Sequence, residues 1–217
     1  MGFGVWRLGL FFSGIVNYLA GMFTGIIECT GKVLSVAQKG TNLSFWISSP
    51  VSGELKVDQS VSHNGVCLTV ESLGDNSHLV TAIEETLSKT NLSDWKADTE
   101  VNIERCMLMN GRLDGHIVQG HVDTTATCLE RKELAGSWEY TFQFPSAFAH
   151  LVIEKGSIAV NGTSLTCFRV GKDRFTIAVI PYTFEHTNIK QVQSGKVVNI
   201  EFDILGKYVQ RRAELGL

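Results

Sequence analysis

The sequence predicts an all-β protein made of two tandem copies of one small barrel, followed by a C-terminal helix. Three observations lead to this fold class. The hexapeptide 64–69 (NGVCLT) recurs 97 positions later as 161–166 (NGTSLT). Each copy contains short runs of β-branched and aromatic residues bounded by Gly, Asn and Asp, which is the signature of strands and turns. The final segment instead carries apolar residues at helical spacing.

The repeat covers most of the chain. Residues 59–104 match 156–201 without a gap, and a weaker echo places 23–28 over 118–123. Copies of about 90 residues are too long for solenoid units, and each is long enough to be a domain. We therefore expect a first barrel at 22–112, a second at 113–203 and a helix at 204–217, preceded by an extension, 1–21, that belongs to neither copy.

The expected strands follow the apolar runs. In the first copy they are 32–36, 43–47, 66–71, 79–83 and 100–103; in the second they are 126–129, 140–144, 157–160, 165–170, 175–180 and 197–202. Turn residues at 74–76 and 171–173 occupy equivalent places and predict hairpin tips. About six short strands per copy favour a closed barrel, because closure removes the sheet edges.

Short helical or looped segments are expected at 85–92 and 182–189, and a short helix opened by proline at 145–152. Near the end, Ile204, Leu205, Tyr208 and Val209 form an apolar stripe at helical spacing. This stripe either caps a barrel or pairs with another subunit, and the pattern alone favours capping.

Composition limits the function classes. The chain has 217 residues, 44% of them hydrophobic, with a net charge of −3 and no long basic block. This balance is that of a globular protein and lacks the electrostatic signature of a nucleic-acid binder. Its five cysteines form no C-x-x-C pair, and their odd number argues against a disulfide framework. We therefore expect a cytoplasmic protein with no nucleic-acid or membrane partner.

The first 21 residues are apolar and glycine-rich, with Arg7 as their only charge. A signal peptide would need a basic start and an unbroken apolar core, and a membrane span needs about 20 apolar residues. The third interpretation, which we favour, is that Met22 is the true start and the preceding residues are an upstream translation or an artefact.

Positions at which the copies differ are candidates for chemistry. Cys67 matches Ser164, Ile26 matches His121, and His63 matches Val160. Two copies of one pocket suit two similar ligands, while the mismatches make the pockets chemically different. Each residue also has a simpler interpretation, since a lone Cys is more often a small buried hydrophobe and a lone His can be structural. A zinc site at His116 and His121 is not expected, because cysteines and carboxylates at ligand spacing are missing nearby.

The motifs, taken together, resemble the riboflavin synthase family. They are MFTGIIE at 22–28, HNGVCLTV at 63–70, ETLSKTNL at 85–92, GHIVQGHVD at 115–123 and NGTSLT at 161–166. The likeness covers about 22–205. It implies Greek-key barrels, a homotrimer formed with the C-terminal helix, and an active site between the first barrel of one subunit and the second barrel of its neighbour. It leaves an assembly with lumazine synthase open.

The resemblance also implies a reaction, the dismutation of two 6,7-dimethyl-8-ribityllumazine molecules without external cofactor or metal. One molecule gives a four-carbon unit to the other, yielding riboflavin and 5-amino-6-ribitylaminopyrimidinedione. The alternative is a non-catalytic protein that binds a lumazine or flavin, because lumazine proteins share the fold. The intact second copy favours the enzyme.

Carried over by motif, the first lumazine pocket would be lined by Gly25, Ile26, Ile27, Cys67, Leu68, Thr69, Thr81, Ala82, Ile83, Glu84, Glu85 and Thr86. The second would be lined by Gly120, His121, Val122, Lys155, Ser164, Leu165, Thr166, Ala178, Val179, Ile180, Pro181, Tyr182 and Thr183. The positions matching the family's chemistry are His121, Ser164, Cys67, Ser60 and Asp203. We expect His121 to relay the 7-methyl proton, and Ser164 or a water to supply the oxygen at C7 of the partner lumazine. Asn161 stands where some relatives carry Asp, so a carboxylate there is not essential.

Overall fold

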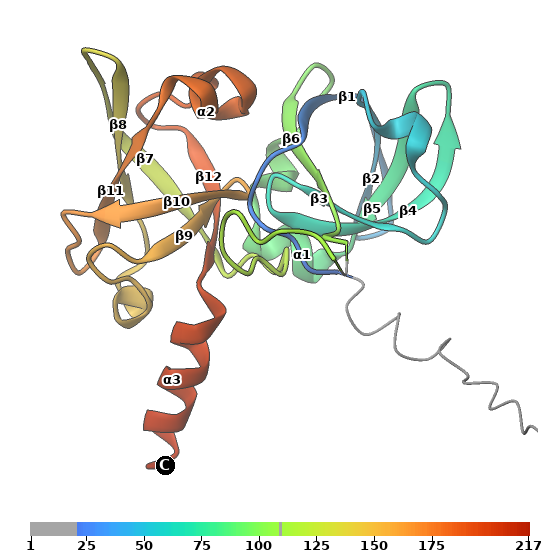
Figure 1. Cartoon of the computed structure of the whole chain (residues 1–217). Coiled ribbons are helices and arrows are strands. Elements are labelled where there is room, and N and C mark those ends of the chain that lie inside the picture. The colour runs from blue at the N-terminus through green and yellow to red at the C-terminus, as the bar shows by residue number, and fades with distance from the viewer. Residues whose placement is uncertain (1–20, 109) are drawn as a thin grey trace, which may run out of the picture.

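The computed structural model describes residues 21–108 and 110–217. They form two closed six-stranded barrels that lie side by side, with a C-terminal helix projecting away from them (Figure 1). The first barrel consists of β1 (Cys29–Lys39), β2 (Asn42–Ser48), β3 (Ser60–His63), β4 (Val66–Gly74), β5 (Ser77–Ala82) and β6 (Glu100–Arg105). The second consists of β7 (Thr124–Leu134), β8 (Ser137–Gln143), β9 (Ser157–Val160), β10 (Thr163–Phe168), β11 (Arg174–Val179) and β12 (Val197–Phe202). The predicted all-β class and duplication are confirmed, whereas the proposed origins of 1–21 concern residues that, except for Gly21, lie outside the described part.

The two barrels have the same topology. Neighbouring strands are antiparallel in the order β1-β2-β5-β4-β3-β6 in the first barrel, and β7-β8-β11-β10-β9-β12 in the second. Since β2 pairs with β5 rather than with β3, the connections are of the Greek-key type. A β-bulge interrupts β1 between Val33 and Ser35, and β7 has its equivalent between Cys128 and Glu130. The duplication therefore extends to local irregularities.

The predicted strand segments match observed strands with small shifts at their ends, except that the short strand β3 was not among them. The segments expected at 85–92 and 182–189 are each split into an α-helix and a 3-10 turn. These are α1 (Glu84–Lys89) with η3 (Asn91–Asp94), and α2 (Pro181–His186) with η5 (Asn188–Gln191). Two further 3-10 turns in the described part of the chain are η2 (Ser52–Glu54) and η4 (Ser146–Leu151), the latter preceded by Pro145 as predicted.

Each barrel encloses its own apolar core. Phe45, Ile47 and Leu92 are fully buried in the first barrel, whereas aromatic rings such as Phe142 and Phe175 fill the second. In β6 the side chains are buried on both faces. Val101 and Ile103 belong to the core, whereas on the opposite face Asn102 contacts the other barrel and Glu104 binds the segment that precedes β1. The equivalent strand β12 repeats this pattern.

A network of asparagines joins the barrels with pseudo-twofold symmetry. The Asn102 side-chain amide donates to the carbonyl of Asn161 at 3.0 Å, and the Asn199 amide donates to the carbonyl of Asn64 at 3.0 Å. The Asn188 backbone N–H donates to Asn102 Oδ1 at 2.7 Å. Since buried amides are costly to leave unpaired, this reciprocal pairing fixes how the two copies meet. The repeated Asn-Gly turns therefore serve the interface between the barrels.

Helix α3 (Ile204–Glu214) confirms the predicted C-terminal helix, but its apolar stripe does not cover a barrel. Leu205, Tyr208 and Val209 are 67%, 69% and 69% exposed. The capping interpretation is therefore wrong for these three residues. On the barrel side, Gly206 approaches Leu151 of η4. Within residues 21–108 and 110–217, no helix has the length and apolar character needed to cross a membrane.

Candidate active site

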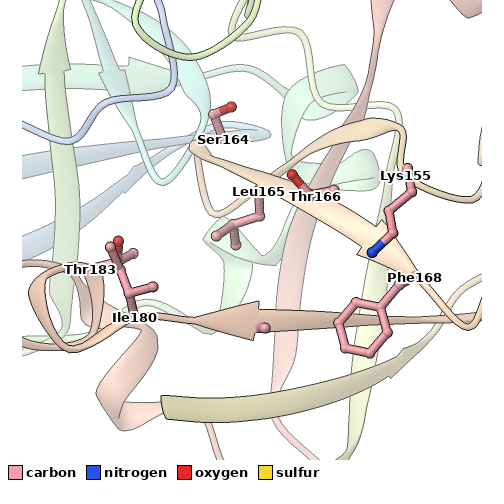
Figure 2. Close-up of a pocket in the computed structure, with 8 residues that line it drawn as sticks. Lys155, Ser164, Leu165, Thr166, Phe168, Ile180 and Thr183 are labelled. Atoms are coloured by element: carbon pink, nitrogen blue, oxygen red, sulfur yellow. The ribbon is translucent and has the colours of Figure 1, made fainter. Parts of the chain in front are cut away.

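The second barrel carries the larger of two pockets formed by repeated residues. Its volume is about 500 Å³. Figure 2 shows Ser164, Thr166 and Phe168 along β10, with the Lys155 side chain near Phe168, whereas Ile180 and Thr183 lie on the segment that follows β11. The Lys155 ammonium lies 5.6 Å from the centre of the Phe168 ring. The lining residues are Lys155, Ser164, Leu165, Thr166, Phe168, Ala178, Ile180 and Thr183. A concave site with one aromatic wall and a few polar groups suits a flat polar heterocycle.

The first barrel carries a smaller pocket, of about 250 Å³, at the equivalent place. Its residues are Val66, Cys67, Glu85, Thr86, Lys89, Thr90, Gly120, His121 and Val122. Cys67 and Thr86 match Ser164 and Thr183 of the larger pocket, so the two pockets share these two positions of the repeat. We call them the Cys67 pocket and the Ser164 pocket.

Two segments, which we call the first strap (residues 23–28) and the second strap (118–123), each contact the pocket of the other copy of the repeat. The Ser164 backbone N–H donates to the carbonyl of Gly25 at 2.8 Å, and the Cys67 N–H donates to that of Gly120 at 2.9 Å. A β-carbon on Gly25 would lie 2.6 Å from Ser164 Cβ, so only glycine permits this approach.

This exchange corrects the predicted grouping of residues. Gly120, His121 and Val122 were assigned to the same pocket as Ser164, but they line the Cys67 pocket. Gly25 was assigned to the Cys67 pocket, but it contacts Ser164. The consequence is chemical, because the Cys67 thiol and the His121 imidazole belong to one pocket rather than to two.

Two buried glutamates at matched positions hold the straps. Glu104 accepts hydrogen bonds from the Thr24 N–H at 2.7 Å and the Gly25 N–H at 3.0 Å. Glu201 accepts from the Gln119 N–H at 2.7 Å and the His121 N–H at 3.0 Å. Burial raises the pKa of Glu104 to about 7, against the effect of these hydrogen bonds, and it also raises the pKa of Glu201.

The structure also brings the buried His116 against Ser164, a contact that the sequence did not predict. Its Nδ1 lies 2.7 Å from Ser164 Oγ, and its backbone N–H donates to Thr24 at 3.1 Å. Burial lowers the pKa of His116, which Asp203 partly opposes, so the imidazole is neutral near pH 7. Its Nε2 is buried and unpartnered among the described residues. The Gly-His pair repeated at Gly115-His116 and Gly120-His121 is the available signal in the sequence, but from the sequence alone we consider His116 only as a zinc ligand.

Known proteins contain the same duplication. The lumazine binding domain family model matches twice, at residues 24–106 and 119–203. Riboflavin synthase of Bacillus subtilis (strain 168) is 38% identical over 191 residues, which cover 88% of this chain and 89% of that protein. Riboflavin synthase of Mycobacterium tuberculosis (strain ATCC 25618 / H37Rv) is 38% identical over 196 residues, covering 88% and 97%.

The chain belongs to the riboflavin synthase family. Among solved structures, LumP complexed with riboflavin superposes with a TM-score of 0.77, covering 83% of this chain and 98% of LumP. Its sequence identity of 19% supports the shared fold alone. The family predicted from the sequence motifs is thus confirmed.

Among the residues that the riboflavin synthase resemblance assigned to chemistry, Ser60 and Asp203 stand beside the pockets rather than in their walls. A hydrogen bond with the Ser60 side chain lowers the pKa of Cys67, but burial has the larger effect and raises it, so Cys67 is a thiol near neutral pH. Asp203 accepts from the Leu205 N–H at 3.0 Å and caps α3. Both residues therefore have contacts that explain their presence by structure alone.

The other residues that the resemblance assigns to the pockets differ in their burial. Leu68, Ala82 and Val179 are buried in the barrel cores, and Thr81 is hydrogen-bonded to Ser44 at 2.8 Å. The exposed ones are Ile26, Thr69, Ile83, Glu84, Pro181 and Tyr182, and Ile27 is half-buried. Exposed residues beside a pocket can contact a ligand only from its open side. Among residues 21–108 and 110–217, no group of three His, Cys, Asp or Glu side chains is placed to hold a metal ion.

Proposed function

We propose that the chain catalyses the riboflavin synthase reaction, in which one 6,7-dimethyl-8-ribityllumazine gives a four-carbon unit to a second. The products are riboflavin and 5-amino-6-ribitylaminopyrimidinedione. The observation that carries this proposal is a pair of pockets that share the matched positions Cys67/Ser164 and Thr86/Thr183 but hold different polar groups. His121 accompanies Cys67 in one pocket, whereas His116 is hydrogen-bonded to Ser164 in the other. Two identical substrates with unlike roles require this combination.

The Ser164 pocket would activate the substrate that accepts an oxygen nucleophile. A neutral His116 accepts the proton of the Ser164 hydroxyl, or of a water held by it, as the oxygen adds to C7 of the bound ring. The pKa of His116 is lowered, so the imidazole is free to accept this proton at neutral pH. A positioned general base contributes typically 10²–10⁴-fold to the rate.

The Cys67 pocket would supply the group that moves the 7-methyl proton of a lumazine. His121 is held there by the Glu201 hydrogen bond to its backbone N–H. The imidazole would take the acidic 7-methyl proton from one lumazine and return it later in the reaction. Holding the two rings in register contributes further, since effective molarities reach about 10⁵ M or more.

The two rings that react would come together across a subunit boundary in a homotrimer, between the first barrel of one subunit and the second barrel of its neighbour. The exposed Leu205, Tyr208 and Val209 on α3 support such an assembly, because monomers rarely leave several large apolar side chains together on one helix in water. Sedimentation of the purified protein measures the assembly, and a monomer at micromolar concentration would contradict it.

The experiment that tests the function is incubation with 6,7-dimethyl-8-ribityllumazine and measurement of riboflavin fluorescence. We expect one riboflavin for every two lumazines consumed, without added metal or cofactor. A non-catalytic lumazine-binding protein is the second candidate, because the chain shares its fold with LumP. Stable binding without conversion would favour that candidate and overturn the enzymatic proposal.

A further inference from the structure

An ion pair connects helix α3 to the second strap, which carries His121. Lys207 Nζ lies 2.7 Å from Asp123 Oδ2, and the two side chains are only 22% and 20% exposed. Exposed ion pairs contribute little, but a pair that is largely removed from water is costly to break on one side. Lys207 therefore has a structural reason to stay against the strap, even though most of α3 is exposed.

Asp123 anchors the end of the second strap to β12. Its Oδ2 accepts the Phe202 N–H at 2.9 Å, and its own N–H donates to the carbonyl of Ile200 at 2.9 Å. The other end of the strap is held by Glu201 through the N–H groups of Gln119 and His121. Burial raises the pKa of Glu201, and the positive charge of Lys207 opposes this shift and so favours the ionised carboxylate that accepts these hydrogen bonds.

The first strap is anchored by a different cation, so its behaviour can be compared with that of the second strap within the same protein. Glu28 matches Asp123 in the repeat, and its partner is Arg105, with Nη2 2.6 Å from Glu28 Oε2. Arg105 is the last residue of β6 and also binds Glu54 at 2.7 Å, so this cation belongs to the first barrel. In the second copy Phe202 stands where Arg105 would, and the cation is supplied by α3 instead.

We propose that Lys207 is a positioning residue that fixes the second strap, and through it His121, in the Cys67 pocket. The helix with the exposed apolar stripe is then linked to the Cys67 pocket through this ion pair. The expected effect on turnover rests on the proposed function, whereas the effect on the strap does not.

The test is amide hydrogen exchange in the full-length protein. In Lys207→Met, which keeps the length of the side chain but removes the charge, we expect exchange at Gln119 and His121 to accelerate by about tenfold or more. Exchange at Thr24 and Gly25, held by Glu104, should stay within about twofold. Lys207→Arg should restore slow exchange, and Arg211→Met, on an exposed pair of the same helix, should change neither strap.

The mirror variant Arg105→Met should loosen Thr24 and Gly25 instead of the second strap. The proposal is overturned if Lys207→Met leaves Gln119 and His121 unchanged, or if it accelerates both straps equally, which would show a general loss of stability. It is also overturned if Tyr208→Glu, with Lys207 intact, loosens the second strap as much, because assembly alone would then account for the effect.

Turnover provides the second measurement. We expect Lys207→Met to lower kcat by about tenfold with a smaller change in KM, because a misplaced proton-transfer group affects the transition state more than binding. If the wild-type protein forms no riboflavin, the proposed function fails while the exchange result still decides the role of Lys207.

Discussion

Gly65 and Gly162 lie back to back where the two barrels meet, and a β-carbon on either would lie 2.7 Å from the backbone nitrogen of the other. Both have positive φ, +79° and +78°. The hexapeptide repeat thus brings its two copies into direct contact at the pseudo-twofold axis, beside the asparagine network that joins the barrels.

We therefore expect Gly162→Ala to destabilise the protein by about 3 kcal/mol or more, because the side chain would force the two backbones apart as well as occupy a strained conformation. Gly40→Ala is the matched control, since Gly40 also has a positive φ, +63°, but has no atom within 4 Å of an added β-carbon. It should cost only about 1 kcal/mol. Chemical denaturation measures both, and equal losses would contradict the close contact.

A buried histidine pair predicts acid sensitivity of the first barrel. His63 Nε2 lies 2.8 Å from His78 Nε2, and His78 Nδ1 lies 2.8 Å from Ser52 Oγ. Burial lowers the pKa of His63 to about 3, with His78 adding to the shift, and burial lowers that of His78 to about 4. In the unfolded chain both groups bind protons near pH 6.5.

The unfolded state therefore holds more protons between about pH 6.5 and 4, so the free energy of unfolding falls as the pH falls. The full contribution is present above pH 6.5, and roughly 3 to 5 kcal/mol should be lost by pH 4.5. The double variant His63→Val, His78→Phe copies the matched Val160 and Phe175 of the second barrel. Its thermal midpoint should depend less on pH, and parallel pH curves for the two proteins would contradict this mechanism.

The pairing of His116 with Ser164 predicts a non-additive effect on turnover. Ser164→Ala and His116→Gln should each lower kcat by about 10²-fold, and the double variant should be little worse than either, because the two side chains act as one unit. His150→Gln, at an exposed histidine of the same barrel, is the control and should retain full activity. Independent, multiplying losses would show that the 2.7 Å contact is not used in the reaction.

His121 should act on catalysis rather than on binding. His121→Gln keeps a polar side chain of similar size but cannot carry a proton, so we expect kcat to fall by about 10²-fold with KM changed by less than about threefold. Titration with riboflavin checks that the ligand still binds. Unchanged turnover would rule out the proton relay.

The sequence by itself determined the duplication, the all-β class, the approximate strand positions and the family. These properties depend on patterns along the chain, namely turn residues between β-branched runs and a repeat in fixed register. Such patterns can be read without knowing how the chain folds. It also pointed to the mismatched pair of Cys67 and Ser164, because a repeat exposes the places where its copies differ.

Only the tertiary structure decided which strap meets which pocket, that His116 binds Ser164, and that the apolar stripe of α3 faces solvent. Each of these depends on how two similar barrels pack together. Because the two copies are similar in sequence, sequence matching alone does not show which strap contacts which pocket. The close approach of Gly25 to Ser164 and of Gly120 to Cys67 selects one arrangement, and it does so through contacts between residues distant in the chain.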